Sequence, residues 1–313
     1  MSILSNSEFE IDTAPPAAAS SLRAAAFGRS PASVRVGAVP SRDGSAAQGL
    51  EERWLHAVAL GGQGRYSAAR AQLAEVRRSG SRGVWVSLAE STEASLLRQL
   101  GWHRVAAVHD GRALAAVAGM DSVDRTADLR ARLVEARCDA LTGLAADALG
   151  RGRLAQARRL LERCADLLVV SRSGDVSRSG DGELQGEGGL LRQRIRLSWV
   201  TAETALASGD FETARMFATR GAADSERFGS VRHQVKSDLL RAAALTDGAD
   251  RAPALGLAAD VCDRAAAHGL IPLRWAASML LVGLGAGVDA ERVRNECATA
   301  VEHGGGRFAT IRP

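Results

Sequence analysis

The sequence has 313 residues, of which 46% are hydrophobic but only 4% aromatic. Its apolar residues are mainly alanine, leucine and valine, a composition that favours an all-α fold in which small side chains let helices pack closely. The 40 basic and 36 acidic residues give a net charge of +4. Their signs are interspersed along the chain, which argues against a nucleic-acid-binding protein with a concentrated basic face. Nearly all the basic residues are arginine, a bias that points to a GC-rich, actinobacterial genome.

The cysteines and the apolar runs indicate the compartment. Four cysteines lie far apart in the chain and form no CxxC pair, which favours free thiols in a reducing compartment. The opening stretch, MSILSNSEFEID, is acidic where a signal peptide would be basic and then apolar. The longest apolar run, AASMLLVGLGAGV, is too short to cross a bilayer. We therefore expect a cytoplasmic protein without membrane contact.

The first segment of the chain is residues 1–47, of which residues 13–47 are rich in Ala, Ser, Pro and Arg and have no sustained period. Such a segment cannot bury enough apolar surface to form its own core. We expect a disordered or loosely docked N-terminal tail. The apolar residues near its start, Ile3, Leu4, Phe9 and Ile11, raise the hypothesis that the tail occupies a groove of its own chain.

From residue 48 onward, apolar residues recur every three or four positions and a frame of Trp, Gly and Ala repeats. In this frame a Trp precedes a Gly by ten residues and an Ala follows the Gly by five. Three frames are complete: Trp54/Gly64/Ala69, Trp199/Gly209/Ala214 and Trp275/Gly285/Ala290. The Gly and Ala alone recur at Gly101 and Gly152, and a looser frame surrounds Gly248.

Each frame predicts two helices joined at the glycine. Glycine permits the backbone that ends one helix, and the small residue lets the next helix fold back against it. Successive turn glycines lie 37, 51, 57, 39 and 37 residues apart. The stretch SRSGDVSRSGDGELQGEGG, residues 171–189, accounts for the excess in the 57-residue interval. We interpret it as a flexible insertion.

The Trp, the small residues at helix contacts and the Gly-x-Tyr or Gly-x-Phe turns resemble the tetratricopeptide (TPR) and related helical-repeat families, whose period is about 34 residues. The resemblance covers residues 48–304, within a predicted repeat domain of residues 48–308. It implies a right-handed α-solenoid of about six antiparallel helix pairs. It also implies protein–protein interaction, with a peptide or partner helix held in the concave groove.

The candidate binding residues are basic side chains on the fourth and fifth helix pairs, together with the repeated tryptophans. They are Arg192, Arg194, Arg196, Arg232, Lys236, Arg241, Trp54, Trp199 and Trp275. If first helices line the concave wall, as the resemblance implies, these cations form one patch for an acidic peptide or a phosphate. The alternative interpretations are a solvated face for the cations and core packing for the tryptophans.

No motif indicates a catalytic, cofactor-binding or metal-ligating residue. The insertion imitates a calcium loop from Asp175, but Gly186 stands where the bidentate Glu is required. Walker, GxSxG and HExxH motifs are absent. We therefore expect a non-enzymatic adaptor or scaffold without cofactors. The alternative is a ligand-sensing regulatory protein linked to transcription or signalling.

Overall fold

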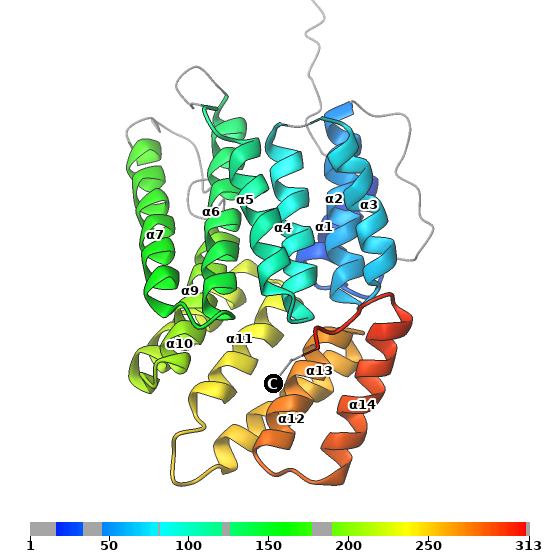
Figure 1. The fold of residues 1–313 in the computed structure, drawn as a ribbon, viewed down its shortest axis with the longest axis vertical. Helices are drawn as coiled ribbons and strands as arrows, with labels where there is room; N and C mark the ends of the chain where they lie inside the picture. The colour runs from blue at the N-terminus through cyan, green and yellow to red at the C-terminus, as the bar shows by residue number, and fades with distance from the viewer. Residues whose placement is uncertain (1–16, 34–45, 81, 121–125, 177–189, 311–313) are drawn as a thin grey trace, which may run out of the picture.

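The computed structural model describes residues 17–33, 46–80, 82–120, 126–176 and 190–310. Within these ranges the chain forms thirteen α-helices and no strand, as the composition predicts (Figure 1). The bounds of the helices are α1 Ala17–Phe27, α2 Ala46–Gly62, α3 Tyr66–Arg78, α4 Val84–Gln99, α5 His103–Ala116, α6 Ala127–Leu149, α7 Leu154–Val176, α9 Leu191–Ala207, α10 Phe211–Phe228, α11 Val231–Ala244, α12 Ala252–Ala267, α13 Ile271–Gly283 and α14 Val288–His303. Among these helices, none is both long and apolar enough to cross a membrane.

All six predicted turn glycines lie between two consecutive helices that pack against each other. The pairs are α2 with α3, α4 with α5, α6 with α7, α9 with α10, α11 with α12, and α13 with α14. Five of the six glycines have a positive φ, between 71° and 87°, a conformation that side chains disfavour. Gly248, the loosest match to the frame, lacks it. The alanines five residues after the turn glycine are buried wherever the frame has one: Ala69, Ala106, Ala157, Ala214 and Ala290.

Two tryptophan bonds repeat along the chain and join neighbouring pairs. The Trp54 indole N–H donates to Thr92 Oγ1 at 2.9 Å, and the Trp199 indole N–H donates to Ser237 Oγ at 2.8 Å. In both cases the acceptor lies 38 residues further along, on the first helix of the next pair. The repeat seen in the sequence is therefore also a repeat of tertiary contacts, which is compatible with a helical-repeat protein.

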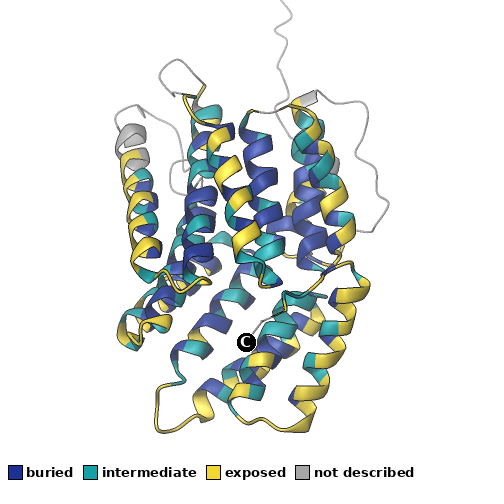
Figure 2. Cartoon of the chain, in the orientation of Figure 1, coloured by how far each residue is buried: buried dark blue, intermediate teal, exposed yellow. Residues whose placement is uncertain are grey.

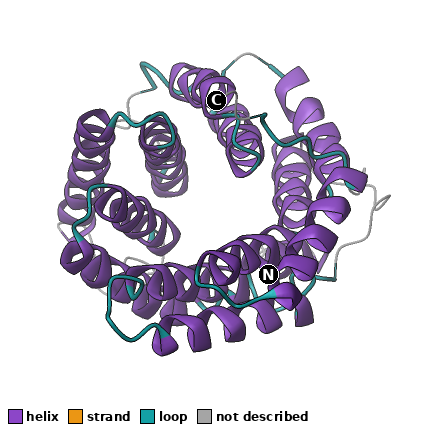
Figure 3. Cartoon of the chain, turned by 60° about the horizontal axis from the view of Figure 1, so that its bottom comes forward, coloured by secondary structure: helices purple, strands orange, loops and turns teal. Residues whose placement is uncertain are grey.

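The helices are arranged in a ring (Figure 3), which contacts between the first helices of the six pairs close. Helices α2, α4, α6, α9, α11 and α13 contact one another in that order, and α13 contacts α2 again. The C-terminal residues strengthen this closure: the Ser67 N–H donates to the Gly304 carbonyl at 2.9 Å, and the Ala309 N–H to the Leu100 carbonyl at 2.7 Å. Exposed residues concentrate on second helices such as α3, α7 and α14 (Figure 2).

Part of the segment expected to be a loose N-terminal tail is a packed helix. Helix α1 packs against α2 and contacts α11, and Phe27 at its end belongs to the largest core cluster. The Gly28 carbonyl accepts a hydrogen bond from the Val231 N–H at 3.2 Å. The last two residues of the expected tail, Ala46 and Ala47, already belong to α2. Residues 1–16 and 34–45 lie outside the described residues, and so does the proposed groove-binding set near the start of the chain.

The predicted insertion at residues 171–189 begins later than expected. Helix α7 continues to Val176, so the first six residues of the insertion belong to a helix. The other thirteen, residues 177–189, lie outside the described residues, and the flexible loop stays a prediction there.

Candidate binding cavity

The ring encloses a cavity of about 510 Å³. All six first helices contribute to its wall, from α2 through α13, whereas the second helices contribute mainly at their ends. Phe27 from α1 and Phe308 from the C-terminal segment complete the lining. The first helices of the pairs, which the resemblance places on the concave wall, therefore face one shared cavity.

Helical periodicity selects which side chains reach the cavity. On α9, Arg192, Arg196 and Trp199 follow one another at intervals of four and three residues, and all three line the cavity. On α11, Arg232 and Lys236 are four residues apart and line it as well. Residues at these intervals share one face of a helix.

Seven of the nine candidate residues meet at this cavity. They are Arg192, Arg196, Arg232, Lys236, Trp54, Trp199 and Trp275. The other two lie elsewhere. The Arg194 Nε points to Asp224 on α10, at 3.9 Å from its Oδ2, and Arg241 is exposed and pairs with Asp238 on its own helix. The alternation 192, 194, 196 turns Arg194 away from its neighbours, since residues two apart point to different sides of a helix.

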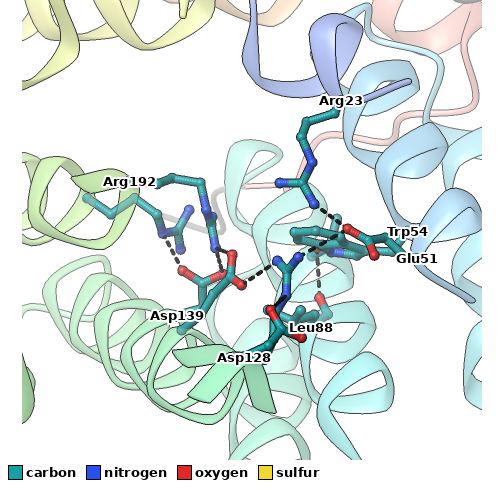
Figure 4. Close-up of polar contacts among 11 residues, drawn as sticks. Arg23, Glu51, Trp54, Leu88, Asp128, Asp139 and Arg192 are labelled. Carbon is teal, nitrogen blue, oxygen red and sulfur yellow. Dashed lines mark hydrogen bonds and ion pairs between the residues drawn. The ribbon is translucent and has the colours of Figure 1, made fainter. Parts of the chain in front are cut away.

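Two cavity arginines on α9 share one carboxylate. The Arg192 guanidinium donates to Asp139 on α6, a contact drawn in Figure 4, and to Glu135 Oε1 at 3.0 Å. The Arg196 Nε lies 3.1 Å from Asp139 Oδ1, but without hydrogen-bond geometry, so this N–H has no acceptor. Arg192 also lies over the ring of Phe27, at 5.2 Å from its centroid. The two guanidinium groups are thus only partly neutralised.

Arg232 on α11 is the least compensated cation of the cavity. Among the described residues, no carboxylate lies within ion-pair distance of it, and its single hydrogen bond is from Nη1 to the Val58 carbonyl at 3.2 Å. Burial, and then repulsion from Arg196, lower the pKa of the Arg232 guanidinium to about 10. Lys236, one turn further along, is paired with Glu203 at 2.6 Å. Within the part of the chain that the structure describes, the positive charge of Arg232 therefore lacks an ion-pair partner.

A second charged cluster, which the sequence did not indicate, borders the cavity at Arg98. This guanidinium donates to Asp110 and Asp147, the latter at 2.8 Å from Nε to Oδ1. Burial raises the pKa of the Asp110 carboxyl to about 7, although Arg98 opposes the shift. The Asp110 carboxylate also packs onto Gly143 of α6, where a Cβ would collide with it. Only glycine therefore fits beneath this carboxylate.

Aromatic rings form the rest of the wall. Trp199 stacks on His233, with centroids 5.2 Å apart and planes 24° apart, and Trp275 packs on Phe308 at 4.9 Å. Burial, and then the nearby Arg232, lower the pKa of His233 well below its usual value. His233 is therefore neutral near pH 7 and adds an aromatic surface rather than a charge.

The groups in the lining are suited to recognition of a ligand. This lining contains no cysteine. Among the described residues, no group of three or more His, Cys, Asp or Glu side chains could hold a metal ion. The cavity instead combines guanidinium groups with flat aromatic surfaces. Comparison with known proteins gave no match, either to a family model or to a curated sequence.

Proposed function

We propose that this chain is a non-catalytic binding protein that holds a small ligand inside its ring of helices, as the sensor part of a regulatory system linked to transcription or signalling. One observation carries the proposal: six first helices, spread over most of the chain, converge on a single cavity of about 510 Å³. This volume is within the range of roughly 300–1,000 Å³ that is usual for small-molecule sites.

The proposal includes a TPR-like architecture, with antiparallel helix pairs arranged in a right-handed array. The recurring turn glycines and the two equivalent tryptophan bonds support it. The proposal also includes a cytoplasmic, actinobacterial protein. The four free cysteines and the preference for arginine over lysine support these assignments.

Ring closure favours a small ligand over the extended peptide that the resemblance implies. In an open solenoid, the concave groove is accessible along its whole length. Here α13 contacts α2, and the C-terminal segment is bonded to Ser67 of α3 and to Leu100 at the end of α4. A long peptide would have to open this contact. The space inside suits a compact molecule that the ring can surround.

An adaptor that binds an acidic peptide is the second candidate function. The arginines of α9 and α11 favour it, because guanidinium groups pair with Asp and Glu side chains in a bidentate manner. In this function the same cavity would take the acidic end of a partner segment. The two functions therefore share residues and differ in the size of the occupant.

A thermal-shift screen of the full chain against a metabolite library and an acidic peptide tests the proposal. A ligand that binds only the folded state raises Tm with concentration. The matched variants are Ala146→Leu, which narrows the cavity, and Ala300→Leu on the exposed face of α14. We expect Ala146→Leu alone to abolish the shift. If no compound shifts Tm, or if both variants respond equally, the proposal is wrong. A shift with only the peptide supports the adaptor.

A further inference from the structure

The unbalanced charge of the cavity indicates the class of its ligand. Of the five cations in the lining, Lys236 pairs with one carboxylate, and Arg98 and Arg192 each pair with two. Arg196 has only Asp139, which it shares with Arg192, and Arg232 has no carboxylate partner among the described residues. An unpaired guanidinium in a buried position costs free energy, because the lost hydration is not replaced. A bound anion would supply the missing partner.

The missing partner belongs between Arg196 and Arg232. Both side chains line the same cavity, and repulsion from Arg196 adds to burial in lowering the pKa of Arg232. Arg196 Nε is buried without an acceptor, and Arg232 donates only one hydrogen bond, to a backbone carbonyl. Each side chain thus has unused N–H donors. A carboxylate or a phosphate between them would accept from both and remove the repulsion.

The rest of the ligand is indicated by the aromatic lining. Trp199 lies one helical turn from Arg196, and Trp275 faces the same cavity from α13. Both indole rings are only partly buried, unlike Trp54, which is 1% exposed. Flat apolar surfaces of this kind favour a planar ring, through stacked or edge-to-face contacts. The anionic and aromatic features occur within one cavity, so one molecule can satisfy both.

We infer that the ligand is a small aromatic anion, whose carboxylate or phosphate pairs with Arg196 and Arg232 and whose ring packs against Trp199 and Trp275. This inference rests on the proposed function, because it names the ligand class of the same cavity. It also explains why the cavity retains Arg232, a cation for which the described residues supply no counter-charge. A site that must bind tightly to an anion keeps its cations unpaired at a cost in stability.

The test titrates the full chain with four probes at constant ionic strength: phenyl phosphate, benzoate, inorganic phosphate and benzyl alcohol. Affinity is measured by calorimetry and by quenching of tryptophan fluorescence. We expect phenyl phosphate or benzoate to bind more tightly than inorganic phosphate and benzyl alcohol, since only these two carry both features. The stronger of the two identifies the anionic group as phosphate or carboxylate.

Arg232→Met and Arg241→Met form the matched pair, because each removes one arginine but only Arg232 lines the cavity. We expect Arg232→Met to weaken binding of the aromatic anion at least about tenfold, the loss expected for a charge-assisted hydrogen bond, and Arg241→Met to leave it unchanged. Arg232→Met should also raise Tm of the empty protein. If Arg232→Met does not fold, Arg232→Gln replaces it in both measurements.

Three results would overturn the inference: equal binding by both variants, tighter binding of benzyl alcohol than of either aromatic anion, or no binding by any probe at concentrations up to the solubility limit. These results leave the proposed function separately testable. A neutral metabolite that stabilises the protein, and that Ala146→Leu excludes, would keep the cavity as a binding site and refute only its preference for anions.

Discussion

The stability of the protein should depend on pH through Asp110, and Asp110→Asn should remove that dependence. The carboxyl is fully buried beside Arg98 and Asp147. Arg196 adds a positive charge nearby, and the His103 ring faces Asp147. Burial raises the pKa of Asp110 from 3.8 to about 7. The folded protein therefore holds a proton that the unfolded chain releases. The free energy of unfolding must fall as the pH rises between these two values.

The size of the effect follows from the pKa. Each pH unit in this window is worth about 1.36 kcal/mol, so the two units between pH 5 and pH 7 give a loss on the order of 3 kcal/mol. Asn cannot ionise and resembles the protonated carboxyl. The variant should therefore gain about 3 kcal/mol relative to the wild type when the pH is raised from 5 to 8.

Urea unfolding at pH 5 and pH 8 measures this difference. Asp247→Asn is the control, because Asp247 pairs with Arg215 at the surface, at 2.9 Å, and both side chains are at least one-third exposed. Its effect on stability should change little between the two pH values. If the difference between the wild type and Asp110→Asn is the same at pH 5 and pH 8, Asp110 does not titrate in this window and the reasoning is refuted.

Three further predictions concern the turns, the insertion and the thiols. Gly209→Ala should lower the free energy of unfolding by roughly 1–2 kcal/mol, because φ of Gly209 is +76°. Gly256→Ala, within α12 and with open space around it, should raise the free energy of unfolding by up to about 1 kcal/mol. Urea unfolding of both variants checks this, and equal effects would contradict it. Replacing residues 177–189 with a short Gly/Ser linker should change Tm little, and a large decrease in a calorimetric scan would mean that this segment packs. The four cysteines are free and buried, so a thiol reagent should label them only as the protein unfolds; rapid labelling of the native protein would show that at least one is accessible.

The sequence predicted the helix pairs well because the turn glycines are local signals. A helix end with a positive φ favours glycine, so the glycine is present in the sequence even where the Trp is missing. The looser match at Gly248 was also informative, since this glycine alone among the six lacks a positive φ. The turn glycines thus predicted where each helix pair turns.

The inward face could have been identified from the same frame. The position ten residues before the turn glycine lines the cavity in five of the six pairs: Trp54, Ser91, Thr142, Trp199 and Trp275. The position six residues before it does so in four: Val58, Ser95, Ala146 and Glu203. Helix positions in phase with these two place Arg196 at the cavity and Arg194 away from it. Grouping the arginines by charge alone assigns both to the cavity.

Other features depend on contacts that no local pattern reports. The cluster of Arg98, Asp110 and Asp147 joins three helices through side chains that are 12 and 49 residues from Arg98. Helix α1 has no turn glycine frame and is held by Phe27, which packs at 5.6 Å from Trp54 and 6.5 Å from Phe228. These contacts join residues that are distant in sequence, so they depend on how the whole ring packs and not on a local pattern.

The contact between α13 and α2 also has a consequence for how this protein can change over evolution. In a linear array each repeat touches only its neighbours, so repeats can be added or lost at the ends and stability grows with their number. Here the first and last pairs bury each other, and Ile271 of the last pair packs on Gly64 of the first (Figure 3). A seventh helix pair would have to separate α13 from α2, and a ring of five pairs would lack the contact between its first and last pairs. The number of repeats is therefore part of the fold, and the ring should unfold as one cooperative unit.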